Sequence, residues 1–328
     1  MKKRCKLILI LAIFGNFIYA QSNDANKLEI LTGGSFAKPK IIPSLTNLAL
    51  AQITINYKLT STERTVGHEK STGATSGAKI TAYLETTDGE LTNADFQEIT
   101  DYFYSYFQNK LKENGIDTIG WNTIIKTDFY KNAVEKDGEG EDEKQGKSGN
   151  VWVTSTAHKG NILYGGATPF AFGKIKKASK FCDEIGAPAG FFHITVDFAD
   201  IMVHVGIKTE GSGLYYYQTR TTKTEWVVES EMKVVPSTHG NTLFWNKKSQ
   251  AESLVQRGDL EAVSNYQDAI NEDASRLKNW YSFSKLWAFN KELDPIVIET
   301  TRAKYKAAAK KALEKYADAF IAKTKDGK

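Results

Sequence analysis

FFHITVDFADIMVH, residues 191–204, contains four polar side chains that a helix and a strand would arrange differently. On a helix, His193, Asp197, Asp200 and His204 would share one face, as the ligands of a metal site do. The apolar residues, however, alternate with polar ones along the first half of the stretch, at Phe192, Ile194, Val196 and Phe198. Period-two alternation accounts for nearly every residue there, so a strand is predicted.

The alternation changes parity around Ala199 and Asp200. Beyond this point the apolar positions are Ile201, Val203, Val205 and Ile207. One inserted residue near Asp200, a β-bulge, would give both halves the same buried face. Residues 193 and 197 of one strand are about 13 Å apart, too far to share an ion. We therefore predict no metal and no cofactor. His193, Asp197, Asp200 and His204 stay as candidate binding residues.

The N-terminus resembles a secretory signal peptide. Residues 1–4 are basic, the apolar run LILILAIFGNFI covers residues 7–18, and cleavage is expected after Ala20. A run of about a dozen residues is shorter than the roughly 20 that span a bilayer. Cys5 precedes the apolar run, so it is not placed for lipidation. A periplasmic or secreted mature protein with no transmembrane segment is predicted.

Composition limits the possible partners and covalent links. Removal of 20 of the 328 residues leaves 308, and Cys182 is then the single cysteine, which excludes an internal disulfide. The net charge of +4 is small for this length. It predicts no nucleic-acid partner.

Residues 47–246 are predicted to form an α/β domain, preceded by an extended, Gly- and Pro-containing arm at residues 21–46. Residues 51–60 alternate apolar and polar side chains, which is typical of a half-buried strand. A polar loop is expected at 61–77 and a second strand at 78–86.

The clearest helix signal begins at Thr92, with Asp95 completing a carboxylate variant of the capping box, and it ends at Gly115. A strand at 116–126 and a short helix at 127–136 are expected to follow. Further elements are predicted as a strand at 151–156, a helix at 172–185 and two or three strands within 213–246.

Two segments differ from this pattern. Residues 136–150 contain no apolar side chain and are predicted to form a mobile acidic loop, whose carboxylates lack the order of an EF-hand. Residues 247–328 are rich in Ala, Lys, Glu and Leu and are predicted to form a helical C-terminal region. Its last helix is expected after Pro295, packed on its own domain through Tyr305, Ala309, Leu313, Tyr316 and Phe320.

The sequence contains none of the motifs GxSxG, HExxH, GxxxxGK[ST], GxGxxG or CxxC. Tyr215, Tyr216 and Tyr217 are consecutive, so a strand would direct at least one of them to solvent, where Tyr favours interfaces. We therefore expect a non-enzymatic protein that binds an envelope protein or a small ligand. Two alternatives remain: a secreted hydrolase with carboxylates near Asp197 and Asp200, and a carrier of a small apolar ligand between the sheet and the C-terminal helices.

The order of elements, with LKENGID, EIGAPAGFFHITVDF and ESEMKVVPSTHGNTLFW at successive helix and strand boundaries, resembles the CsgG/TolB N-terminal type of envelope α/β domain. The resemblance covers residues 51–246. It implies an open sheet with helices on one face and a non-enzymatic envelope role, and it transfers no functional residue. The predicted fold class is thus α+β, with a mixed or largely antiparallel sheet, helices on one face and the helical C-terminal region.

Overall fold

The computed structural model describes most of the chain, in nine segments: residues 24–32, 40–68, 75–132, 141–145, 150–164, 172–210, 219–238, 240–271 and 291–326. The predicted signal peptide (residues 1–20) lies outside these segments, as do Tyr215, Tyr216 and Tyr217.

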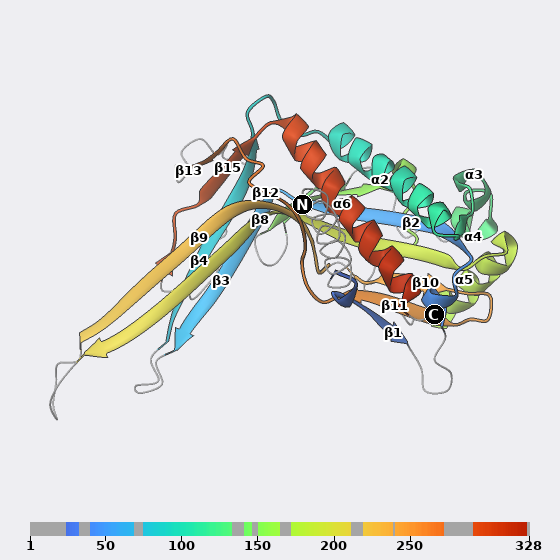
Figure 1. The fold of residues 1–328 in the computed structure, drawn as a ribbon, viewed down its shortest axis with the longest axis horizontal. Helices are drawn as coiled ribbons and strands as arrows, with labels where there is room; N and C mark the ends of the chain where they lie inside the picture. The colour runs from blue at the N-terminus through green and yellow to red at the C-terminus, as the bar shows by residue number, and fades with distance from the viewer. Residues whose placement is uncertain are drawn as a thin grey trace, which may run out of the picture.

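A ten-stranded sheet runs through the centre of the described part of the molecule (Figure 1). Its main path has the order β1-β11-β10-β8-β2-β7-β6, in which β2 and β8 are parallel and the other neighbours are antiparallel. The strands of this path are β1 (Leu28–Thr32), β2 (Asn47–Lys58), β6 (Glu141–Gln145), β7 (Val151–Thr156), β8 (Ala189–Glu210), β10 (Thr242–Trp245) and β11 (Ala251–Gln256). Three more strands branch from it: β5 (Asp117–Thr118) on β2, β9 (Thr219–Val235) on β8, and β12 (Leu260–Ser264) on β9.

A second sheet has five strands among the described residues, in the order β13-β15-β4-β14, with β3 also on β4. Its members are β3 (Thr60–His68), β4 (Thr75–Thr86), β13 (Ala269–Asn271), β14 (Lys291–Glu292) and β15 (Ile296–Thr300). Both β14 and β15 run parallel to β4, and β3 runs antiparallel to it. Two mixed sheets combined with helices confirm the α+β class.

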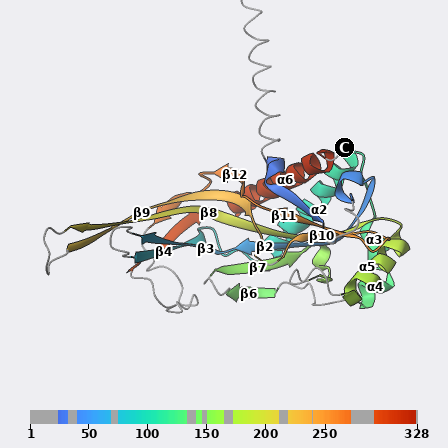
Figure 2. The ribbon, with the colours of Figure 1, turned by 90° about the horizontal axis from the view of Figure 1, so that it is seen from below.

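Helices cover both faces of the central sheet at the end opposite the long hairpins (Figure 2). The two long helices, α2 (Asn93–Glu113) and α6 (Arg302–Lys325), lie together over one face. The shorter ones, α3 (Trp121–Ile124), α4 (Asp128–Asn132) and α5 (Phe172–Ile185), pack in a separate core against the other face. The expectation of helices on one face therefore holds only for α2 and α6. The reason is that β2 buries apolar side chains on both of its faces.

A cluster of four aromatic rings holds α2 and α6 to the sheet. Phe107 of α2 lies 5.2 Å from Phe192 of β8 and 5.3 Å from Phe320 of α6, measured between ring centroids. Phe244 of β10 stacks on Phe320 at 5.7 Å. All four side chains are fully buried, and each contributes a large apolar area to the core. The space between the sheet and α6 is thus occupied by packed rings, which leaves the apolar-carrier alternative without support.

Several predicted elements are confirmed. The Thr92/Asp95 capping box is present at the start of α2, and the strand at 151–156 and the helix at 172–185 have the predicted bounds. The last helix buries the predicted face of Tyr305, Ala309, Leu313, Tyr316 and Phe320 against its own domain.

The strand prediction at 51–60 needs two corrections. β2 is buried on both faces, because helices or other chain segments cover each side of it. Its register against β8 steps from Leu50–Gly190 to Gln52–Phe191, so Ala51 is an extra residue. Ala51 consequently faces the α5 side, while Ile53 and Ile55 face the α2 side.

The predictions of a loop at 61–77 and of a strand at 116–126 are also partly wrong. Residues 60–68 form β3, whose backbone pairs with β4 although its side chains are mostly polar. Residues 116–126 contribute only the two-residue β5 before α3 begins at Trp121. Of the predicted mobile loop at 136–150, residues 141–145 form the edge strand β6, and most of the rest lies outside the described segments. An edge strand needs backbone pairing and no apolar side chain, so composition did not reveal it.

The two ends of the chain join the folded body more closely than expected. The N-terminal segment at 21–46, which was predicted to be extended, contains β1, which pairs with β11. It also contains the short 3-10 helix η1 (Ile42–Ser44), whose Ile42 is buried. The predicted helical region is helical from Arg302 onward, whereas its earlier described part forms β11 to β15. These strands are short and depend on neighbours far away in sequence, which composition does not show.

Two hairpins extend away from the body and form what we call the arm (Figure 1). The arm consists of β3, β4, residues 199–210 of β8 and residues 219–230 of β9. β3 packs closely on β8, because an ideal Cβ placed on Gly67 would lie 2.3 Å from the carbonyl oxygen of Val205. Among the described residues, no helix combines the length and the apolar character needed to cross a membrane.

Candidate functional site

The strand prediction for residues 191–198 is confirmed, and β8 continues to Glu210. Its register against β9 steps from Asp197–Lys233 to Ala199–Ser230, so one residue of β8 faces two of β9. Phe198 and Ala199 both belong to the main core, which places the change of face one residue before the predicted position. The extra residue lies on β9, not on β8 as predicted. Alternation within one strand shows where the face changes but not which partner carries the insertion.

Seven buried polar side chains line the sheet face opposite α2 and α6, and we call them the polar stripe. They come from β2, β7 and β8: Gln52, Thr54, Asn56, Thr154, His193, Thr195 and Asp197; Thr156 of β7, opposite Thr54, is buried on the same face. The register places Thr54 beside His193 and Asn56 between Thr154 and Thr195. Two predicted binding residues, His193 and Asp197, are therefore brought into one row of polar groups.

Gln52 anchors another segment to the stripe. Its Oε1 accepts hydrogen bonds from the backbone N–H groups of Leu163 at 2.8 Å and Tyr164 at 2.9 Å, and its Nε2 donates to the Tyr164 carbonyl at 3.0 Å. The same Nε2 lies 2.9 Å from Oγ1 of Thr54 and 3.3 Å from Nε2 of His193, a ring nitrogen that accepts a hydrogen bond in the tautomer protonated at Nδ1. The Tyr164 ring meets the His193 ring edge-on at 5.4 Å. His193 is thus part of a packed polar contact.

Asn56 and Thr195 leave polar atoms without partners in the middle of the stripe. Asn56 is 2% exposed and accepts a 2.8 Å hydrogen bond from Thr154 through Oδ1, but its Nδ2 has no partner among the described residues. Thr195 is 3% exposed, and its Oγ1 likewise has no partner in the part of the chain that the structure describes. A buried polar group without a partner costs about 1–3 kcal/mol. These adjacent groups can therefore hydrogen-bond a water molecule or another polar group.

Asp197 and Asp200 are each neutralised by a lysine. Asp197 forms an ion pair with Lys58 and accepts a 3.1 Å hydrogen bond from Ser61. Asp200 lies 2.6 Å from Nζ of Lys233, which is also 3.0 Å from Asp259. Burial opposes the charge of Lys233, but its hydrogen bonds to the two carboxylates raise its pKa. Structural ion pairs therefore account for both acids, and the hydrolase alternative gains no support from their positions.

His204, the fourth polar residue of the opening stretch, lies on the exposed side of the arm opposite Glu225 of β9. Met202 and Val227 face each other two positions along the strands, on the same face as His204, and are 56% and 46% exposed. Sequence reasoning missed this apolar pair. The available signal was Met202 lying between the apolar positions 201 and 203, which places it on the opposite face of a strand.

The structure separates the residues that a helix would have brought together. His193 and Asp197 are buried in the polar stripe, whereas Asp200 lies at the base of the arm and His204 lies on its surface. Within the described segments, no three His, Cys, Asp or Glu side chains are grouped so that they could hold a metal ion.

No family model, no curated protein and no solved structure matches the chain. The resemblance to the CsgG/TolB N-terminal type of domain therefore stays a prediction from the sequence.

Proposed function

We propose that this is an exported cell-envelope protein that acts by binding and assembling with another protein, without catalysis, and that the arm is its binding element. The signal-peptide pattern at residues 1–20 supports export. The arm supports the binding role. The main observation in favour of this role is the exposed apolar pair Met202 and Val227 on a projecting hairpin.

An edge available for pairing accompanies the apolar pair. Residues 219–229 of β9 have β8 as their one strand neighbour in the part of the chain that the structure describes. An open strand edge offers N–H and C=O groups to an added strand. The exposed ion pair between Lys223 and Glu225 places charges along this strand, and such charges disfavour indiscriminate strand pairing. A protein that contributes an extended segment beside β9 fits this surface.

A photo-crosslinking amino acid placed at position 202 or 227 of the full-length chain tests the binding role in intact cells. We expect one protein to be crosslinked from both positions, because both side chains lie on the same exposed face. Position 31 is the matched control, since Leu31 is also exposed, at 38%, but lies on β1 in the body. Absence of a crosslink from 202 and 227, or the same products from position 31, would contradict the proposal.

Export is tested separately by fractionation and intact mass. The expected species lies outside the cytoplasm and begins at Gln21. A chain that retains Met1 and stays in the cytoplasm refutes export without affecting the arm as a binding element.

A further inference from the structure

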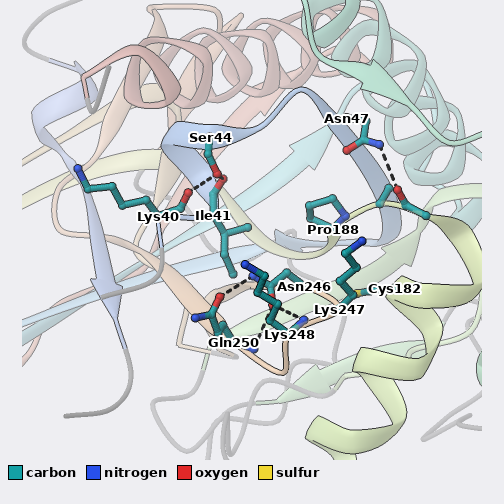
Figure 3. A pocket seen from close by; sticks show the side chains of 12 residues that line it. Lys40, Ile41, Ser44, Asn47, Cys182, Pro188, Asn246, Lys247, Lys248 and Gln250 are labelled. Atoms are coloured by element: carbon teal, nitrogen blue, oxygen red, sulfur yellow. Dashed lines mark hydrogen bonds between the residues drawn. The ribbon is translucent and has the colours of Figure 1, made fainter. Parts of the chain in front are cut away.

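A pocket of about 380 Å³ (Figure 3) is built from segments next to α5, β10 and β11, at the end of the body far from the arm (Figure 1). It is bounded by the chain before β2, by the segment that joins α5 to β8, and by the turn after β10. Asn47 closes one wall by donating a hydrogen bond from Nδ2 to the carbonyl of Gly186 at 3.3 Å. The pocket is within the size range of small-ligand sites.

The charge around this pocket has one sign. Lys40, Lys247 and Lys248 line it, and no acidic residue is among its described lining. None of the three ammonium groups has an ion-pair partner in the described segments. Figure 3 shows Lys247 lying between Cys182 and Pro188. The Lys40 side chain points away from the other lining residues in Figure 3, so Lys247 and Lys248 supply the positive charge of the pocket. A concave surface with two positive charges and no counter-charge attracts an anion.

The nearby negative groups do not cancel this charge. The carboxylate of Glu252 is buried and accepts a 2.8 Å hydrogen bond from the backbone N–H of Ile42, so it anchors the wall from behind. Asp183 lies on α5 beside Cys182 but is exposed and outside the lining. The C-terminal end of α5 adds about half a negative charge, which is less than the charge of the two lysines of the turn.

The turn that carries two of the lysines is held in one conformation. Oδ1 of Asn246 accepts hydrogen bonds from the backbone N–H groups of Lys248 at 2.9 Å and Gln250 at 3.1 Å. Ser249 adopts a positive φ of 59°, and its hydroxyl lies 2.8 Å from that of Ser179 on α5. A turn fixed in this way positions Lys247 and Lys248 before a ligand arrives, which lowers the entropy cost of binding.

Part of the wall is apolar. Ile41, Ala187 and Pro188 contribute hydrocarbon surface. Cys182 adds a buried thiol, and burial raises its pKa to about 12, so the thiol stays neutral. An inorganic anion would leave this surface unused. We propose that the pocket binds a small organic anion whose charged group meets the lysines and whose apolar part packs on Ile41 and Pro188.

Fluorescence titration of the mature chain with 8-anilinonaphthalene-1-sulfonate tests the proposal, because this probe combines an anionic group with aromatic rings. We expect saturable binding with a Kd that rises about tenfold in the Lys247→Gln/Lys248→Gln double variant, which corresponds to about 1.4 kcal/mol. The control is Lys112→Gln/Lys131→Gln, which removes two exposed lysines from α2 and α4 outside the pocket, and its Kd should equal that of the unmodified chain.

Two further measurements show where the probe binds and whether its sulfonate group contributes to binding. N-phenyl-1-naphthylamine, which lacks the sulfonate, should bind both double variants equally. Ile270→Lys should leave the anion titration unchanged, because this exposed apolar residue of β13 lies outside both the pocket and the arm. Equal loss in both lysine variants, loss in Ile270→Lys, or full displacement by millimolar inorganic phosphate would overturn the assignment of an organic anion to this pocket.

Discussion

The two halves of β8 show how one strand serves two different environments. Residues 191–198 lie in the body, where α2 and α6 cover one face and Phe191 joins the α5 core on the other. Residues 199–210 lie in the arm, where one face packs toward β3 and the other presents Met202 and His204. The body gains stability from burial on both sides, while the arm keeps one side available. Stability and binding surface are thus separated along one continuous strand.

The arm depends on the packing of its hairpins against each other. A two-stranded hairpin alone is marginally stable in water, so β8 and β9 need a further layer. That layer is β3 and β4, and the close approach of Gly67 to Val205 shows how tightly the two layers meet. Substitutions in the arm should therefore favour local unfolding of the arm before they destabilise the body.

The largest expected effect distinguishes the body from the arm. Phe107→Ala removes the ring that contacts both Phe192 and Phe320, and it should lower the free energy of unfolding by about 3–5 kcal/mol. Met202→Ala, in the exposed position of the same sheet, should change it by less than about 0.5 kcal/mol. Guanidinium denaturation of both variants gives the two values, and similar losses would mean that Met202 is as important to packing as Phe107.

An intermediate effect is expected within the arm. Gly67→Ala places a Cβ against the carbonyl of Val205, so β3 must move away from β8, at a cost of about 1–3 kcal/mol. Gly206→Ala is the matched control on β8, because the nearest atom to its new Cβ is the Lys223 carbonyl oxygen at 3.9 Å. Hydrogen exchange should accelerate in the arm of Gly67→Ala alone. Acceleration spread evenly over the body would show that the arm and the body unfold as one unit.

The smallest effect concerns the start of α2 in the body. Burial opposes the charge of Asp95, but hydrogen bonds from Thr92 and Arg302 lower its pKa from 3.8 to about 2. The folded state therefore gains stability that is fully present above pH 3.8 and is lost as the pH falls toward 2. Asp95→Asn should cost about 1 kcal/mol at neutral pH, as loss of a helix cap does.

Thermal unfolding of both proteins between pH 2 and 6 checks the role of Asp95. The stability difference between the two proteins should shrink as the pH falls through this range. A difference that stays constant down to pH 2 would assign the effect to something other than the charge of Asp95.

Features set by neighbouring residues could be predicted from the sequence. The capping box of α2 needs only Thr92 and Asp95, and the strand character of residues 191–198 needs only their alternation. Elements that depend on a distant partner were missed. β3 and β6 have few apolar side chains and exist because β4 and β7 pair with their backbones.

The candidate sites also combine features that neighbouring residues predict with features that depend on distant partners. His193 and Asp197 could be chosen as polar residues of a strand, but their partners could not. Gln52 is 141 residues from His193, and Lys58 is 139 residues from Asp197. The register of β2 against β8 brings these pairs together, and it also makes neighbours of Asn56 and Thr195, whose Nδ2 and Oγ1 have no hydrogen-bond partner among the described residues. The pocket likewise combines lysines from two distant parts of the chain, Lys40 and the turn after β10.

Local periodicity in this chain specifies which segments are strands or helices and which of their side chains are apolar, because these properties depend on residues a few positions apart. The partners of each polar group, the strand that carries the extra residue opposite Phe198 and the exposure of Met202 depend on how separate segments pack. Strand register and layer packing are long-range properties, so they appear only once the whole chain has folded.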